Sequence, residues 1–197
     1  MSGLAIFGYA SLVSPRSASQ TLGRPVEIAA VARLRGWSRG WTLGRDNVTS
    51  EKTFARPDGT VPRFCLGLNI EGSGSPTDPN GVLIALTASE LERLDVREIR
   101  YRRVDVTDAV DSELDGSNAP PFDAVFAYTA RPEHHHPSPP PDSIIVAAYP
   151  ATVEAAFAEL GPPHLELYRA STATPPVEVT PARLVRDKIP AGNPRDW

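Results

Sequence analysis

Short runs of apolar residues, separated by polar and turn-forming stretches, recur along the chain and predict strands. The first run is Leu4–Phe7, which leads into small residues from Gly8 onward. Further predicted strands lie in residues 26–43 (one bent strand or two short ones), 64–70, 82–87, 101–107 and 122–129. Many short strands with few helices favour an α+β fold, a small mixed β-barrel with flanking helices.

Three segments carry the signals of helix starts and stops, namely capping residues, a proline in the first turn or a terminal glycine. They are Ser14-Pro15 with Gly23, Thr87 with Glu90, and residues 144–160 with Pro150 dividing them and Gly161 ending them. From residue 162 the chain is rich in proline, with one short strand candidate near Val177. We therefore expect one domain over residues 1–161 and a C-terminal extension, 162–197, packed on the same domain.

Composition narrows the class of protein. The length of 197 residues suits one domain, and 41% hydrophobic with 22% charged residues exclude wholesale disorder. The net charge is -4, and Lys52 and Lys188 are the only lysines, so a nucleic-acid partner is not expected. The single cysteine, Cys65, excludes a disulfide framework and a thiolate zinc site within one chain.

The apolar runs are short. None approaches the roughly 20 residues that span a bilayer, and the stretch from Leu4 is too short for a signal peptide and has no basic segment before it. We therefore expect a cytoplasmic protein with no membrane partner. The pattern does not indicate an oligomeric state.

Glu98 is the first candidate for chemistry. At 100° per residue it shares one helical face with Leu91 and Leu94. A carboxylate in line with an apolar stripe points toward the interior, where desolvation makes it a useful base. The alternative is that the helix ends before Glu98, which then lies on the surface or pairs with a nearby arginine: Arg97, Arg100 or Arg102.

The loop after the first strand, Phe7-Gly8-Tyr9-Ala10-Ser11-Leu12, is the second candidate. A strand that breaks into small residues exposes successive backbone N–H groups, which can bind a carboxylate or a developing oxyanion. The alternative is an ordinary turn at the end of a strand. The glycine spacing and the lysine of a phosphate-binding loop are absent.

Together the two candidates resemble the gamma-glutamylcyclotransferase-like superfamily. The family's Tyr-Gly-Ser loop and its Leu-Asp helix, followed by a glutamate and a tyrosine strand, correspond here to Tyr9, Ala10 and Ser11, then Leu94, Asp95, Glu98 and Tyr101. Residues 32–37, Ala-Arg-Leu-Arg-Gly-Trp, resemble the second strand of the ChaC branch. Tyr149 is placed like a family tyrosine near the substrate, and the resemblance covers residues 4–161.

The resemblance implies an enzyme that releases 5-oxoproline from a small γ-glutamyl compound. The α-amino group of the substrate attacks its own γ-carbonyl, Glu98 is the general acid/base, and no metal or organic cofactor takes part. The implied substrate-binding residues lie in the first loop and the late helix: Phe7, Gly8, Tyr9, Ala10, Ser11, Leu12 and Tyr149. The leaving group stays open between glutathione, γ-glutamyl amino acids and γ-glutamyl amines, because variable loops such as 71–81 and 130–143 are expected to read it.

Two departures from the family pattern keep alternatives open. Ala10 stands where the family has glycine, and its methyl group is expected to narrow the pocket. Ile99 follows Glu98 where many members have glycine. The first alternative is therefore a non-catalytic member that binds a small carboxylate or a protein.

The second alternative is a metalloprotein in which His134–His136 and His164 bind a metal ion. The other interpretation of these histidines is a polar loop that is exposed to solvent.

Overall fold

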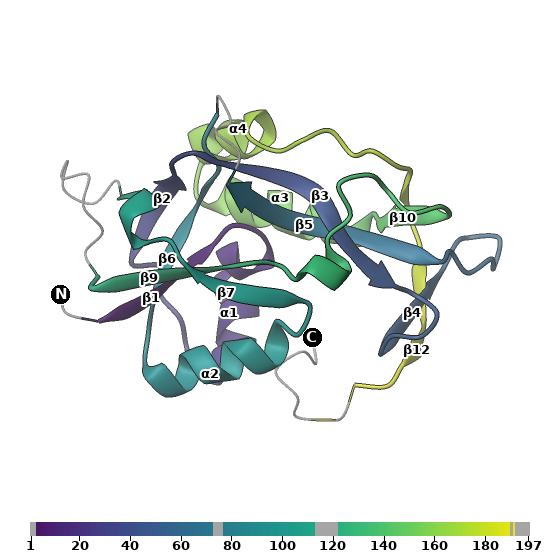
Figure 1. Ribbon diagram of the computed structural model, residues 1–197, viewed down its shortest axis with the longest axis horizontal. Coiled ribbons are helices and arrows are strands. Elements are labelled where there is room, and N and C mark those ends of the chain that lie inside the picture. Colours follow the sequence, from purple (N-terminus) through teal and green to yellow (C-terminus); the bar gives the residue numbers. More distant parts are fainter. Residues whose placement is uncertain (1–2, 73–76, 113–121, 190, 192–197) are drawn as a thin grey trace.

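The computed structural model describes residues 3–72, 77–112, 122–189 and 191 (Figure 1). Its strands form three sheets. The six-stranded sheet has the order β7-β9-β1-β6-β2-β8, the four-stranded sheet β11-β10-β5-β3, and β12 pairs with β4. The strands are β1 Leu4–Gly8, β2 Ala30–Leu34, β3 Trp37–Asp46, β4 Lys52–Ala55, β5 Phe64–Gly72, β6 Asn80–Leu86, β7 Tyr101–Asp105, β8 Val110–Ser112, β9 Ala124–Ala130, β10 Ser143–Val146, β11 Val179–Thr180 and β12 Arg183–Asp187.

Four α-helices flank the sheets in the described ranges. They are α1 Pro15–Leu22, α2 Ala88–Arg97, α3 Ala148–Glu159 and α4 Pro162–Ala170, with short 3-10 turns at η1 Ser11–Val13, η2 Thr107–Ala109 and η3 Pro132–His134. The helix signals at two sites are confirmed. Ser14 accepts a hydrogen bond from the Ser17 N–H and Gly23 ends α1 at φ 73°, while Thr87 and Glu90 form the capping box of α2. No helix of the described residues has the length and apolar character needed to cross a membrane.

The first strand lies in the middle of the larger sheet. β1 pairs antiparallel with β6, from Leu4 opposite Leu86 to Gly8 opposite Val82, and parallel with β9. The apolar residues of β1 are buried because a strand pairs with each edge of β1 and helices pack on the sheet. β1 therefore ends in the interior of the molecule, and the loop that follows it begins there at Tyr9.

The two larger sheets meet along β5 and β9 and curl into a half-barrel. Asn69 Oδ1 of β5 accepts a hydrogen bond from the Ala130 N–H of β9 at 2.7 Å. The Tyr101 hydroxyl of β7 donates to the Leu68 carbonyl at 2.8 Å. The predicted α+β class with a small mixed barrel is thus confirmed, and Figure 1 shows β3 and β5 crossing above β7 and β9.

Three details of the predicted elements were wrong or undecided. Residues 26–43 form two strands, β2 and β3, separated by a turn at Gly36 with φ 73°. The segment from Ile144 does not begin a helix, because it forms β10 beside β5. Pro150 does not divide α3 either, since it lies in the first turn, where a missing N–H breaks no helical hydrogen bond.

The segment after residue 161 carries more structure than one strand. α4 packs on α3 through the stacked rings of Phe157 and Tyr168, whose centroids are 4.5 Å apart. The strand expected near Val177 is β11, at Val179–Thr180, and it pairs with β10. The chain then runs along the side of the molecule to β12, which pairs with β4 (Figure 1).

Candidate active site

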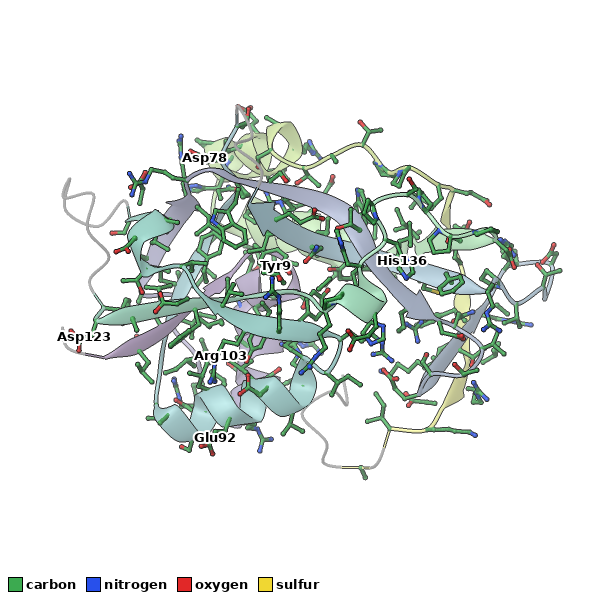
Figure 2. All side chains as sticks on the ribbon, in the orientation of Figure 1. Tyr9, Asp78, Glu92, Arg103, Asp123 and His136 are labelled. Carbon is green, nitrogen blue, oxygen red and sulfur yellow. The ribbon has the colours of Figure 1, made fainter. Side chains whose placement is uncertain are left out.

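A cavity of about 40 Å³ lies between the end of β1, the end of α2 and the start of α3. Its lining contains all eight residues singled out in the sequence, with two further tyrosines: Phe7, Gly8, Tyr9, Ala10, Ser11, Leu12, Glu98, Tyr149, Tyr101 and Tyr128. Figure 2 shows Tyr9 near the middle of the molecule. The volume corresponds to a few water molecules.

The loop that lines this cavity turns sharply after Gly8. A Cβ added at Gly8 would lie 3.0 Å from the Cβ of Leu12, so the loop folds back closely over the end of β1. The backbone N–H groups of residues 9–12 donate to no atom in the described parts of the chain, because the strand pairing stops at Gly8 and η1 is only beginning. These groups are thus available to a ligand in the cavity.

Glu98 lies directly after α2, as its C-cap, and only 15% of its side chain is exposed. Its carboxylate Oε1 lies 3.3 Å from Nε of Arg97, whose side chain is 3% exposed. Both expectations for this residue therefore hold in part: the helix ends before Glu98 and an arginine pairs with it, yet the side chain lines an interior cavity. Arg100 instead pairs with Glu51.

Arg97 also connects Glu98 to the loop. Its Nη2 donates to Ser11 Oγ at 3.0 Å and to Ser17 Oγ at 3.4 Å. One buried guanidinium thus touches the carboxylate, the loop and the first turns of α1. Sequence reasoning treated Arg97 only as a counter-ion for Glu98 and missed this second contact, which depends on the packing of α1 against α2.

The four tyrosines supply hydroxyl groups to the cavity walls. Tyr9 donates to the Tyr128 carbonyl at 2.8 Å, and Tyr128 donates to Asp95 Oδ1 at 2.7 Å. Burial raises the pKa of all four phenols, so they stay protonated near neutral pH. Glu98 is the only carboxylate among the lining residues, and the lining includes no histidine or cysteine.

Arg39 is 1% exposed, and it binds the backbone of the loop that lines the cavity. Nη1 donates to the carbonyls of Tyr9 and Asn80 at 2.9 and 2.8 Å. The other guanidinium nitrogens bind the end of α4: Ser171 Oγ at 2.9 Å, Thr172 Oγ1 at 2.8 Å and the Tyr168 carbonyl at 3.4 Å. Burial lowers the pKa of Arg39 to about 9. The guanidinium therefore ties the C-terminal segment to the loop of the candidate site.

Sequence reasoning missed Arg39, although a signal was present. It lies between Trp37 and Trp41 at alternate positions of one strand, and such positions share a face. An arginine that shares a strand face with aromatic residues can be buried only if hydrogen-bond acceptors surround its guanidinium group. The acceptors come from β6 and α4, which no local pattern connects to β3.

The histidine loop lies elsewhere. His135 contacts Glu71, and His136 packs against the ring of Phe64 with centroids 5.7 Å apart. Burial lowers the pKa of His134. Among the residues that the structure describes, no group of three or more His, Cys, Asp or Glu side chains is placed to hold a metal ion.

No protein-family model matches the chain, and no curated protein matches it in sequence. Solved structures do match its fold. A protein described as gamma-glutamyl cyclotransferase aligns with a TM-score of 0.58 at 16% identity, covering 89% of this chain and 92% of the other. An uncharacterized human protein aligns with the same TM-score at 17% identity and the same coverage.

A third structure, YkqA from Bacillus subtilis, aligns with a TM-score of 0.53 at 17% identity. The alignment covers 85% of this chain and 53% of that protein, about half its length. At these identities the likeness concerns the fold. The half-barrel with its flanking helices matches the fold of that gamma-glutamyl cyclotransferase, and this chain therefore has the gamma-glutamylcyclotransferase-like fold.

Proposed function

We propose that this protein is a gamma-glutamyl cyclotransferase that releases 5-oxoproline from a small γ-glutamyl compound, with Glu98 as the general acid/base. The supporting observation is the composition of the cavity wall. One carboxylate lies in the same cavity wall as a loop whose residues 9–12 have N–H groups without a partner among the described residues, and the other ionisable lining groups are phenols whose pKa values are raised by burial. A reaction that needs one acid/base group and an anion-binding turn suits this arrangement.

In the proposed reaction, Glu98 accepts a proton from the α-ammonium group of the substrate. The freed amine attacks the γ-carbonyl carbon, and the five-membered ring closes because both groups belong to one molecule. The C–N bond to the leaving group then breaks, the proton held by Glu98 passes to the departing amine, and the ring nitrogen releases its second proton to solvent, which leaves the neutral lactam. The N–H groups of residues 9–12 bind the α-carboxylate or the oxyanion of the intermediate.

The surroundings of Glu98 fit a base. The adjacent Arg97 guanidinium attracts a negative charge on the carboxylate, which favours the ionised form that accepts a proton. The hydroxyls of Tyr9 and Tyr101 remain neutral, and because each already donates to a backbone carbonyl, they can accept hydrogen bonds from the N–H groups of the substrate. Tyr149 packs edge-on against Trp41, with ring centroids 6.2 Å apart, so this wall of the cavity is aromatic.

The cavity of about 40 Å³ is smaller than a γ-glutamyl group requires. Binding of a whole γ-glutamyl group therefore requires the cavity to widen, and Ala10 is one of the residues that line it. This observation favours one second candidate function: a non-catalytic member of the fold that binds a small carboxylate or a protein partner. The two functions differ in turnover, which can be measured directly.

The test is the release of 5-oxoproline from a panel containing glutathione, γ-glutamyl amino acids and γ-glutamyl amines. Turnover of at least one compound, lost in Glu98→Gln, supports the proposed enzyme. No turnover of any panel member by folded protein contradicts it and leaves the binding function. Saturable binding of 5-oxoproline without turnover would identify the non-catalytic member.

We further propose that residues 1–161 form the domain that carries the site and that 162–197 extend and brace it. Packing of α4 on α3 and pairing of β11 with β10 support an extension that packs on the same domain. The proposed compartment is the cytoplasm, which suits a chain whose one cysteine, Cys65, is buried and free.

A further inference from the structure

A second cavity, of about 180 Å³, lies on the other side of the β7–β9 ribbon from the candidate active site. The strand register separates the two. Arg102 and Thr129 are paired across β7 and β9 and line the second cavity, whereas their neighbours Tyr101 and Tyr128 line the first. Successive side chains of a strand point to opposite faces, so the side chains of Arg102 and Thr129 face away from those of Tyr101 and Tyr128.

Glu71 forms one wall of this second cavity, and its carboxylate is held in a set orientation. Oε1 accepts hydrogen bonds from the Thr42 hydroxyl and from Asn69 Nδ2, the latter at 3.2 Å. His135 Nε2 also lies 3.0 Å from Oε1, without the geometry of a hydrogen bond. Oε2 accepts from no donor in the described ranges, so it is available to a ligand.

The Asn69 amide is itself fixed, which makes the carboxylate support rigid. Its Oδ1 accepts from the Ala130 N–H at 2.7 Å, while its Nδ2 donates to Thr42 Oγ1 at 3.0 Å and to Glu71. Asn69 is 1% exposed, and it lies where the two sheets meet. A buried amide whose oxygen is anchored to β9 and whose Nδ2 donates to the carboxylate holds that carboxylate in a preorganised position.

Arg102 supplies the opposite charge. It is exposed and forms no ion pair with any residue that the structure describes, unlike Arg103, which pairs with Asp95 on α2. Figure 2 shows Arg103 between β7 and α2, and as the next residue of the strand it points to the face opposite to Arg102. Trp37 and Val104, both half-buried, complete the lining with apolar surface.

We propose that this cavity binds a small zwitterion, an amino acid or dipeptide with an apolar side chain. Its ammonium group donates to Glu71 Oε2, its carboxylate pairs with Arg102, and its side chain packs on Trp37 and Val104. Opposite charges on an aromatic-lined cavity are the complement of such a molecule, and charge-assisted hydrogen bonds give it orientation. This site is independent of the proposed cyclotransferase activity, because binding there requires neither Glu98 nor turnover.

The test uses L-phenylalanine as the probe, measured by isothermal titration calorimetry. Two analogues remove one charge each: phenethylamine lacks the carboxylate, and 3-phenylpropionate lacks the ammonium group. We expect saturable binding of L-phenylalanine, and about ten- to hundredfold weaker binding of each analogue. Equal binding of either analogue would overturn the zwitterion site, as would no binding of L-phenylalanine, L-leucine or the dipeptide Gly-Phe at about 10 mM.

Two variants test which residue binds the ammonium group of the ligand and which binds its carboxylate. Glu71→Gln is expected to weaken L-phenylalanine about tenfold or more and to leave 3-phenylpropionate unchanged. Arg102→Met is expected to weaken L-phenylalanine similarly and to leave phenethylamine unchanged. Arg103→Met is the matched control, because it removes a neighbouring charge on the opposite strand face, and L-phenylalanine binding should persist. Thermal melting of each variant checks the fold, and a loss of binding in Arg103→Met equal to that in Arg102→Met would contradict the proposal.

Discussion

Arg97 holds Glu98 through its Nε, 3.3 Å from the carboxylate Oε1, although the two residues are neighbours in the chain and the helix ends between them. The same guanidinium donates to Ser11 Oγ at 3.0 Å. The candidate base and the candidate anion-binding loop are therefore parts of one buried polar cluster. We therefore expect a substitution in this cluster to lower kcat more than a substitution elsewhere on α2.

The first prediction concerns Glu98. Glu98→Gln keeps the shape of the side chain but cannot accept the ammonium proton, so kcat should fall by roughly 10²–10⁴-fold. Steady-state release of 5-oxoproline from the best substrate measures the change. Glu92→Gln is the matched control, since Figure 2 places Glu92 on the outer surface of α2. Near-normal turnover in folded Glu98→Gln would mean that another residue is the base.

The second prediction concerns Arg97. Arg97→Met removes the cation beside Glu98, and loss of a nearby positive charge disfavours an ionised carboxylate. The acidic limb of the kcat/KM–pH profile should therefore move to higher pH than in the unmutated protein. Profiles of both proteins from about pH 5 to 9 measure the shift. An unchanged limb, with only a lower melting temperature, would show that Arg97 acts on stability alone.

The third prediction concerns Ala10, which lines the cavity with a negative φ of -139°. Because glycine at this position mainly adds conformational entropy to the unfolded chain, Ala10→Gly should change stability by less than about 1 kcal/mol. Removing the methyl group widens the cavity, so KM for a γ-glutamyl substrate should fall while kcat changes little. Denaturant unfolding and steady-state kinetics measure the two effects. A large loss of stability with unchanged KM would assign residue 10 to packing.

The fourth prediction concerns Arg39. Arg39→Met leaves the carbonyls of Tyr9 and Asn80 buried without their donor, and we expect a loss of roughly 3 kcal/mol or more in the free energy of unfolding. Urea denaturation is the measurement. Arg35→Met is the control, because that side chain is 54% exposed and pairs with Asp111 at the surface, where such pairs contribute little. Similar losses in both variants would contradict a special role for Arg39.

The fifth prediction concerns the pH dependence of stability at the start of α2. The Arg24 guanidinium hydrogen-bonded to Glu90 lowers the pKa of that carboxyl. A lowered folded-state pKa gives stability that is fully present above the unfolded value, about 4.3, and is lost as the pH falls through the folded value. Glu90→Gln keeps the capping box but loses the charge.

The free energies of unfolding of the unmutated protein and Glu90→Gln should therefore differ at pH 7 and converge as the pH falls below about 4. Urea titrations at a series of pH values between about pH 7 and pH 3 measure the difference. The unmutated protein should be the more stable near neutral pH. A difference that stays constant across the series would show that the Arg24 contact does not depend on the charge of Glu90.

Local patterns determined much of this molecule. The apolar run at Leu4–Phe7 predicted β1, and the capping box at Thr87 and Glu90 predicted the start of α2, because strand burial and helix caps depend on residues close in the chain. Local patterns also indicate the loop after β1 and Glu98 as candidates for chemistry, and the fold brings both to one cavity. What these residues do there stays a prediction.

Tertiary structure decided the rest. Ile144 and Ile145 lie in a strand because β5 and β11 offer them pairing partners, which outweighs the helical pattern of their sequence neighbours. Arg39 is buried because acceptors from β6 and α4 surround it. Glu71 and Arg102 line one cavity because β5 meets β9, the pairing partner of β7, where the two sheets join. Such relationships depend on segments far apart in the sequence, so only the packing of the sheets creates them.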